Sequence, residues 1–286
     1  MRSLFRRDNR LGLLVALPFA AFVGLFLVYP MVVVIYKSVM SDGTFSLDAL
    51  GRAVSGPYRT GFINSIALSF WSALIGGVIG LLLALTMKSL ARPRWLHSSL
   101  DAWSSVASQL GGIILAFAFI ATIGAQGAVT KVFMNFGIDL KSMGVSTTGF
   151  WGLVVVYLYF QIPLMFLVMM PAVNGLKASW REAAAIMGAS PLRYWRTVAV
   201  PILTPSTLGG ILLLFVNSFT AYATAYVLNA SYPIVPLQIR FLLQGNVITG
   251  EEDLGNAIVF WVILLLLTSL LLVTVMQRRT LKWMSS

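Results

Sequence analysis

Residues 63–87 read INSIALSFWSALIGGVIGLLLALTM and contain no Asp, Glu, Lys or Arg. The hydrocarbon core of a bilayer is about 30 Å thick, so an α-helix needs about 20 residues to cross it. A charged side chain at the bilayer centre costs about 2.5–3.5 kcal/mol on the insertion scale, which explains why the stretch holds none. The stretch therefore predicts a transmembrane helix.

Five further stretches have the same apolar character. They are Leu11–Tyr36, Trp103–Gly124, Phe150–Val173, Pro201–Leu228 and Asn256–Met276. Trp103–Gly124 is the least apolar at its start, where the sequence reads WSSVASQ. We expect an all-α membrane protein with about six transmembrane helices. We also expect a single domain over residues 1–286, with its core at about 60–280.

The overall composition is that of a chain whose main solvent is lipid. Hydrophobic residues make up 58% and charged residues 10%, and the mean hydropathy is +0.88. In soluble proteins, about 45–50% of the residues are apolar and about 25% are charged. The first apolar stretch could alternatively be a signal peptide preceded by basic residues. It is longer than a signal core of about 7–15 residues and no small-residue cleavage site follows, so we expect a retained span.

Basic residues are distributed unevenly between the two faces of the membrane. With six spans, both termini and the segments 88–102 and 174–200 lie on one face. That face carries 14 of the 20 Lys and Arg residues and three acidic residues, whereas the other face carries six of each kind. Lys and Arg are enriched in cytoplasmic loops. We therefore expect both termini in the cytoplasm, and the net charge of +11 needs no nucleic-acid partner.

The longest cytoplasmic segment, residues 174–200, reads NGLKASWREAAAIMGASPLRYWRTVAV. Lys177–Met187 is rich in Ala and contains no Gly or Pro, which predicts a helix. Gly188 predicts the end of that helix, because glycine readily adopts the left-handed conformation. We therefore expect a sharp bend at Gly188.

A second short helix is predicted after this bend. Ser190 suits an N-cap and Pro191 suits the first helical position. Leu192, Trp195 and Val198 recur at i, i+3 and i+6, which predicts an apolar stripe. By composition alone, the two helices could equally form an amphipathic elbow that lies on lipid headgroups.

A motif in this segment resembles the cytoplasmic signature of the permeases of binding-protein-dependent ABC importers. That signature is Glu-Ala-Ala, three residues, Gly, nine residues, then Ile-x-Leu-Pro. Here Glu182–Ala184 is followed at the same spacings by Gly188 and by Val198–Pro201, with valines in place of Ile and Leu. Members of that family have five or six spans, with this loop before the last two. Most of the chain resembles that arrangement.

The resemblance implies that the segment 174–200 is a coupling loop, which contacts a separate ATPase subunit and transmits its closure to the permease. The residues at the matching positions are Glu182, Ala183, Ala184, Gly188, Ala189, Ser190 and Pro191. In this reading Gly188 shapes the turn and Glu182 supplies a polar docking group.

The resemblance also implies partners and a location. Permeases of this family work as pairs, identical or homologous, with two ATPase subunits and a periplasmic or extracellular substrate-binding protein, in the bacterial cytoplasmic membrane. We expect ATP and Mg²⁺ on the ATPase, and no cofactor, metal ion or catalytic residue in this chain. Its nearest match to a phosphate-binding loop, residues 245–250, is followed by Glu251 where Lys is required. The chain has no cysteine, and we expect its one histidine, His97, in a solvated loop.

The fifth span is the most polar one and suggests a path for the substrate. Asn217, Thr220 and Thr224 recur at i, i+3 and i+7, which predicts one helical face, and Tyr222 belongs to a stripe beside it. Gln161 in the fourth span is a further candidate. The resemblance implies that this face lines the translocation path. Alternatively, its polar side chains form hydrogen bonds between helices.

Three features bear on the substrate and on the class of transporter. Met187 stands where related sugar permeases often carry an acid, and residues 221–226 and 235–239 resemble permeases for polyamines or aminoalkylphosphonates. We expect that substrate class, with sugar, sulfate and iron as alternatives. A secondary transporter would normally carry ionisable residues within its spans. A channel would leave the motif in the coupling loop unexplained.

Overall fold

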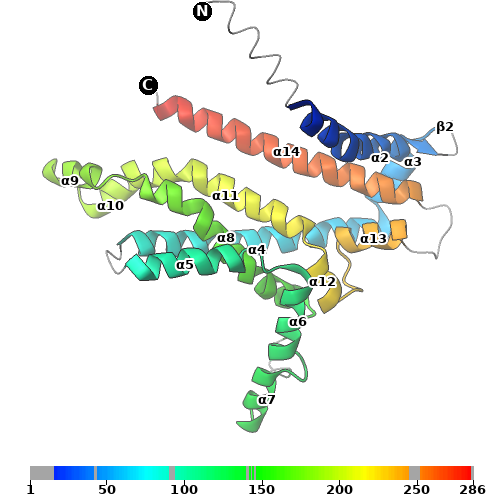
Figure 1. Ribbon diagram of the computed structural model, residues 1–286, viewed down its shortest axis with the longest axis horizontal. Helices are drawn as coiled ribbons and strands as arrows, with labels where there is room; N and C mark the ends of the chain where they lie inside the picture. The colour runs from blue at the N-terminus through cyan, green and yellow to red at the C-terminus, as the bar shows by residue number, and fades with distance from the viewer. Residues whose placement is uncertain are drawn as a thin grey trace, which may run out of the picture. The chain divides into compact units, whose positions relative to one another are not determined.

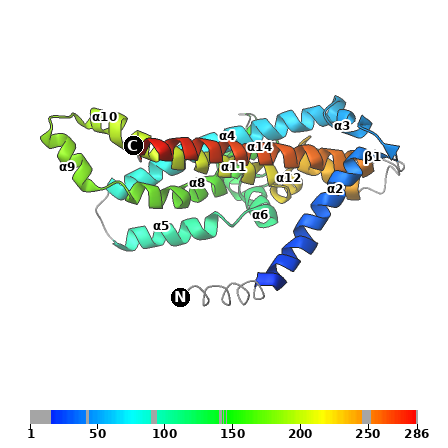
Figure 2. The ribbon, with the colours of Figure 1, turned by 90° about the horizontal axis from the view of Figure 1, so that it is seen from above.

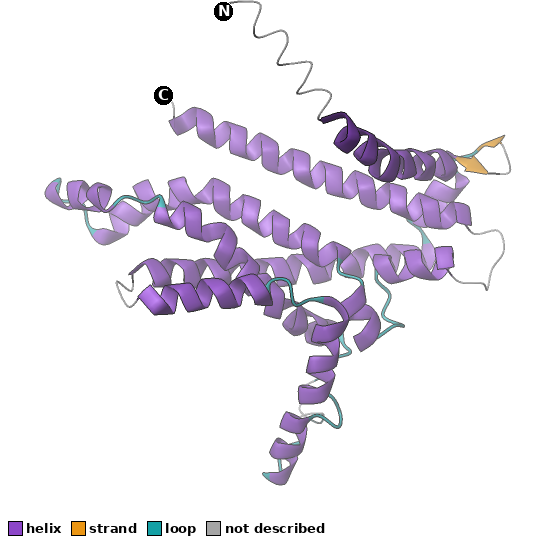
Figure 3. Ribbon diagram, in the orientation of Figure 1, coloured by secondary structure: helices purple, strands orange, loops and turns teal. Residues whose placement is uncertain are grey.

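A computed structural model of the chain describes residues 16–41, 44–89, 94–139, 142, 144, 146–244 and 252–284. Most of the described chain is helical (Figures 1 and 3). Six helical segments are long and apolar enough to cross a membrane: Ala16–Val39, Gly56–Ser89, Gly112–Asn135, Phe150–Asn174, Pro191–Thr220 and Glu252–Leu272. The predicted all-α fold with about six spans is confirmed. Residues 2–10 and the segment 245–251 lie outside the described residues.

The chain forms two compact units. The first comprises the residues up to Arg59 together with Gln238–Leu264. After a helix from residue 16, its elements are η1 (Gly24–Val28), α2 (Tyr29–Val39), the paired strands β1 (Met40–Ser41) and β2 (Thr44–Phe45), and α3 (Asp48–Ala53). The helices α13 (Val235–Gln244) and α14 (Glu252–Met284) also contribute to it. The indole of Trp261 donates to the Leu50 carbonyl at 3.0 Å, which joins α14 to α3.

The second unit comprises Thr60–Leu237 and Leu265–Ser286. Its long helices are α4 (Gly56–Ser89), α5 (Arg94–Ala107), α8 (Phe150–Asn174) and α11 (Val200–Thr220), which run side by side (Figures 1 and 2). The short helices α6 (Gly112–Ile123) and α7 (Ala128–Asn135) project away from these four. A loop with the short helices α9 (Ala178–Ile186) and α10 (Pro191–Tyr194) lies at one end of them.

Small residues bring the long helices of this unit together. A Cβ atom added to Gly80 of α4 would lie 2.6 Å from Cβ of Met165 in α8. One added to Gly77 would lie 2.8 Å from Cγ1 of Ile211 in α11. Glycine at these positions therefore allows the backbones to approach closely.

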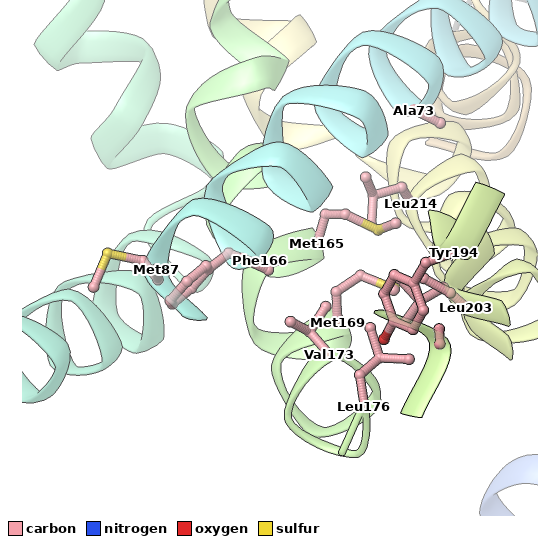
Figure 4. Close-up of a cluster of buried hydrophobic side chains, with 13 residues drawn as sticks. Ala73, Met87, Met165, Phe166, Met169, Val173, Leu176, Tyr194, Leu203 and Leu214 are labelled. Atoms are coloured by element: carbon pink, nitrogen blue, oxygen red, sulfur yellow. The ribbon is translucent and has the colours of Figure 1, made fainter. Parts of the chain in front are cut away.

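Buried side chains form a cluster at the loop end of these helices (Figure 4). Its members come from α4, α8, α11 and the loop: Ala73, Ala84, Met87, Met165, Phe166, Met169, Val173, Leu176, Ala184, Tyr194, Ala199, Leu203 and Leu214. Leu176, Ala184 and Tyr194 belong to residues 174–200, so the loop is packed onto the ends of the long helices.

The third predicted span, Trp103–Gly124, is wrong as a continuous helix. The helix α5 ends at Ala107, and α6 begins at Gly112 with φ of +74°. A positive φ suits glycine and interrupts a right-handed helix. The polar start of this stretch therefore marks a helix break. His97, expected in a solvated loop, lies on α5 and is half-buried.

The fifth predicted span, Pro201–Leu228, is also interrupted. The helix α11 ends at Thr220, and α12 (Ala223–Leu228) begins after a break at residues 221–222. Neither residue is Gly or Pro, so no local signal marks this break. Tertiary contacts hold it, because the hydroxyl of Tyr157 donates to the Ala221 carbonyl at 2.8 Å.

Candidate functional site

A cavity of about 280 Å³ lies where the two helix breaks of the second unit meet. Its lining residues are Ser108, Gln109, Gly111, Gly112, Phe160, Asn217, Ala221, Tyr222, Ala223 and Thr224. Nine of the ten come from the two breaks and the helix ends beside them, and Phe160 comes from α8. Discontinuous helices of this kind form the binding sites of many transporters, because the interrupted backbone leaves polar groups free to face a solute.

The chemistry of the cavity is polar and uncharged. Ser108 and Tyr222 contribute hydroxyls, Gln109 and Asn217 contribute amides, and Phe160 contributes an aromatic wall. The rings of Tyr222 and Tyr226 stack, with centroids 5.5 Å apart. Among the described residues that line the cavity, none is Asp, Glu, Lys or Arg. Such a surface can exchange hydrogen bonds with a polar solute without holding it by an ion pair.

The two breaks are joined by one side chain. The Thr224 hydroxyl accepts a hydrogen bond from the Gly112 N–H at 2.8 Å and lies 3.2 Å from the Gly112 carbonyl, to which it donates. The first N–H groups of a helix have no partner within the helix. Thr224 of α12 therefore provides a hydrogen-bond acceptor for the N–H group of Gly112 at the start of α6. The wall of the cavity depends on this contact.

Three of the five candidates for the substrate path line the cavity, and two do not. Asn217, Tyr222 and Thr224 line the cavity, although the predicted single helical face is wrong because the helix ends between them. Thr220 does not line it, and its hydroxyl donates to the Val216 carbonyl at 2.9 Å. Gln161 has no exposed surface and donates to the Leu214 carbonyl at 2.8 Å, which is the hydrogen bonding between helices expected as the alternative.

Sequence reasoning missed the half of the cavity that α5 and α6 provide. Ser108, Gln109, Gly111 and Gly112 all lie inside the predicted continuous span Trp103–Gly124. The glycine pair next to polar residues inside an apolar stretch is the signal that could have shown the break. A pair of interrupted apolar segments is a pointer to a binding site in transporters.

The predicted corner of the coupling loop is present. The helix α9 ends in a Schellman motif, in which the Ala189 N–H donates to the Ala184 carbonyl at 2.9 Å and the Gly188 N–H donates to the Ala185 carbonyl at 3.0 Å. Gly188 has φ of +76°, as the helix stop predicts. The Ser190 hydroxyl then caps the next helix by accepting from the Arg193 N–H at 3.3 Å.

The second helix of the loop is longer than predicted. Pro191 begins a helical run that continues through a π-helical turn, η2 (Trp195–Ala199), into α11. In that turn the Val200 N–H reaches back to the Trp195 carbonyl, which accommodates Pro201 and its missing N–H. Leu192 and Trp195 of the predicted apolar stripe are exposed, and the residue of this helix that packs onto the long helices is Tyr194.

The coupling loop has one packed face and one exposed face. Ala184 lies in the cluster of Figure 4 and is 7% exposed. Ile186 and Met187, which flank the Gly188 corner, are 88% and 79% exposed. The remaining matching residues of the motif, Glu182, Ala183, Gly188, Ser190 and Pro191, are exposed, and Ala189 is half-buried.

Residues 76–286 match the family model of the binding-protein-dependent transport system inner membrane component. The chain belongs to this family. It is thus a multi-pass membrane protein, the permease subunit of a binding-protein-dependent ABC importer, as the motif of the coupling loop predicts.

Curated relatives of this permease differ in their named substrates. A spermidine/putrescine transport system permease of Haemophilus influenzae is 26% identical over 76% of each chain. A putative ferric transport system permease of the same organism is 24% identical over 77% of this chain and 34% of its own length. A probable sulfate transport system permease of Chlorella vulgaris is 22% identical over 80% of this chain and 84% of its own. The chain thus spans about a third of the ferric relative.

Solved structures share the fold of this permease. A chain of a bacterial ABC transporter involved in the import of the acidic polysaccharide alginate matches 96% of it with a TM-score of 0.74 and 18% identity. A chain of the inward-facing MetNI methionine ABC transporter matches 79% of it with a TM-score of 0.52 and 16% identity. At these sequence identities, the similarity shows a shared fold alone.

Proposed function

We propose that the permease forms one half of a translocation pathway and that the cavity at the two helix breaks is part of that pathway. The observation that carries this proposal is the meeting of two interrupted helices around a polar, uncharged cavity. An uncharged lining suits passage, since tight capture would be the task of a separate binding protein. The other half of the pathway comes from a second permease, identical or homologous.

The coupling loop is the contact of the permease with a separate ATPase. Its exposed Ile186 and Met187 support this, because large apolar side chains at a solvated corner mark a surface for a protein partner. Its packed residues Leu176, Ala184 and Tyr194 lie in one cluster with residues of α4, α8 and α11. A displacement of the loop would therefore move the helices that build the cavity.

The partners follow from this arrangement. We expect two ATPase subunits, which bind ATP and Mg²⁺ and carry out hydrolysis, together with a second permease and a periplasmic or extracellular binding protein. The coupling loop and both termini lie in the cytoplasm, and the distribution of basic residues supports this orientation. One of the solved relatives is an alginate ABC transporter in complex with a periplasmic protein that holds an alginate pentasaccharide.

Affinity purification of the tagged permease from its own cells tests this assembly. We expect a second permease and an ATPase to elute with it in mild detergent, and ATP hydrolysis to be present in the eluate. A variant with Ile186 and Met187 both replaced by Asp should elute with less ATPase and an unchanged amount of the second permease. Equal amounts of ATPase in both preparations would contradict the docking role of the corner.

The substrate class that the cavity supports best is a small organic amine, a polyamine or an aminoalkylphosphonate. The amide oxygens of Gln109 and Asn217 can accept hydrogen bonds from an ammonium group, and the ring of Tyr222 can contact a cation over its face. The matched spermidine/putrescine permease is consistent with this class.

Uptake of labelled solutes with and without this permease separates the candidate substrates. Cells that produce the complete transporter should accumulate labelled spermidine, putrescine or 2-aminoethylphosphonate faster than cells in which this permease is deleted. Sulfate, ferric iron and maltose serve as the comparison solutes. Loss of sulfate, iron or sugar uptake upon deletion, with amine uptake unchanged, would reject the amine class and leave the assembly intact.

A further inference from the structure

The side chain of Lys88 forms an unusual contact at the cytoplasm-facing end of α4, next to the coupling loop. Its ammonium group donates hydrogen bonds to two backbone carbonyls, those of Val173 and Leu176. A lysine at the end of a transmembrane helix usually extends its charge toward water or lipid headgroups. Lys88 remains exposed, but its ammonium group instead contacts the point where α8 ends and the coupling loop begins.

This corner of the loop has a simpler closure than its other corner, since the Gly175 N–H donates to the Pro171 carbonyl at 3.0 Å and the Leu176 N–H donates to the Val173 carbonyl at 3.2 Å. The last four carbonyls of a helix have no partner within the helix. At the end of α9, a Schellman motif at Gly188 satisfies them. At the end of α8, Gly175 keeps a right-handed conformation with φ of −64°, and Lys88 supplies donors from another helix.

The contact lies beside a group of packed residues that connects α4 to the helices of the coupling loop. Leu176, whose carbonyl accepts from Lys88, places its side chain in the same buried cluster as Ala184 and Tyr194. Met87, the neighbour of Lys88, belongs to this cluster as well (Figure 4). One end of α4 and the first corner of the loop are therefore held together by both polar and apolar contacts.

We propose that Lys88 is a positioning residue of the coupling mechanism, which fixes the first corner of the coupling loop to α4. This inference rests on the proposed coupling role of the loop, and it adds the element that transmits loop movement to the second span. The charge also suits the negative end of the α8 dipole. Without the ammonium group, the loop would keep its Gly188 corner but lose its fixed position relative to α4.

Chemical rescue in this cysteine-free chain tests the proposal. The Lys88→Cys variant is purified in nanodiscs and modified with 2-aminoethyl methanethiosulfonate, which restores an ammonium group, or with methyl methanethiosulfonate, which does not. Hydrogen exchange of peptides from residues 176–190 is measured by mass spectrometry. We expect several-fold faster exchange in the unmodified and methyl-modified protein, and exchange close to wild type in the aminoethyl-modified protein.

Two controls separate a loss of position from a loss of folding. Peptides from α12 should exchange at the wild-type rate in every sample, and so should the loop of Lys131→Met, a lysine replacement on α7. Lys88→Arg, which keeps the donors and the charge, should protect the loop as the wild type does. Wild-type exchange in the methyl-modified protein would overturn the proposal, and so would a loss of loop protection in Lys88→Arg.

The intact complex distinguishes this proposal from the coupling role on which it rests. If Lys88→Met speeds loop exchange and also lowers the stimulation of ATP hydrolysis by the loaded binding protein, both stand. If loop exchange rises while the stimulation is unchanged, Lys88 positions the loop and the coupling role of the loop is wrong. Unchanged loop exchange in Lys88→Met refutes the positioning role, whatever the hydrolysis rate is.

Discussion

The hydroxyl of Thr224 is hydrogen-bonded to both polar groups of Gly112, at 2.8 Å from the nitrogen and 3.2 Å from the oxygen. The two residues are 112 positions apart in the chain, and each lies at the start of a helix that follows a break. This side chain therefore adds polar contacts between α6 and α12, whose buried residues Leu115, Ala116, Ala225 and Leu228 also lie in one apolar cluster. The cavity that the two breaks surround depends on their being held together.

Thr224→Val should destabilise the second unit. Valine has nearly the shape of threonine but leaves the part-buried Gly112 N–H without its partner. A fully buried unpaired donor costs about 1–3 kcal/mol, so we expect the free energy of unfolding of the purified permease to fall toward the lower end of that range. Thr224→Ser, which keeps the hydroxyl, should stay close to wild type. Equal stability of the valine and serine variants would show that the contact is unimportant.

Gly80→Ala should loosen the contact between α4 and α8. The added Cβ would lie 2.6 Å from Cβ of Met165 and 2.7 Å from the Ile162 carbonyl, so the helices must move apart. Overpacking of this kind costs about 1–3 kcal/mol. Gly24→Ala is the matched control, because nothing lies within 4 Å of its added Cβ. Thermal unfolding of the two variants should differ clearly, and equal melting temperatures would contradict the packing described.

Gly188→Val should impair transport without blocking membrane insertion. A β-branched residue at φ of +76° is strained by about 1–3 kcal/mol, although no neighbouring atom blocks the side chain. The corner would relax and shift Ile186 and Met187. Gly188→Asn should retain most activity, because Asn tolerates the left-handed conformation. Uptake and stimulated ATP hydrolysis at equal expression measure the effect, and wild-type values for the valine variant would refute it.

The orientation of the chain can be checked with single cysteines, since the protein has none of its own. A cysteine at Ser190 should react with an impermeant maleimide only after the cells are opened. A cysteine at Ser231, in an exposed segment between α12 and α13, should react in intact cells. Labelling of position 190 from outside sealed cells would reverse the proposed topology.

The long apolar stretches and the Gly188 corner could be predicted from the sequence because their causes are local. Span length follows from hydropathy, and the helix stop follows from the conformational freedom of glycine. The cavity could not be predicted because its causes are tertiary. The break at residues 221–222 contains no Gly or Pro, and it is held by Tyr157, more than 60 positions away.

The continuation of the second loop helix into α11 was also missed, for a related reason. Proline at position 201 suggested the start of a new element, because it removes an N–H from a helical ladder. A π-helical turn just before it accommodates that loss. The buried face of the loop likewise follows from the packing of Ala184 and Tyr194 on the long helices, which periodicity within the loop does not reveal.

Photo-cross-linking from Met187 tests the central claim most directly, namely that the corner of the coupling loop docks on a separate ATPase. A photoreactive amino acid is placed at Met187 in the complete complex, with the same residue at Val132 of α7 as the control. We predict a cross-linked product of permease and ATPase from position 187, with a yield that changes when ATP is added, and no such product from position 132. A product from neither position, or equally from both, would contradict the account.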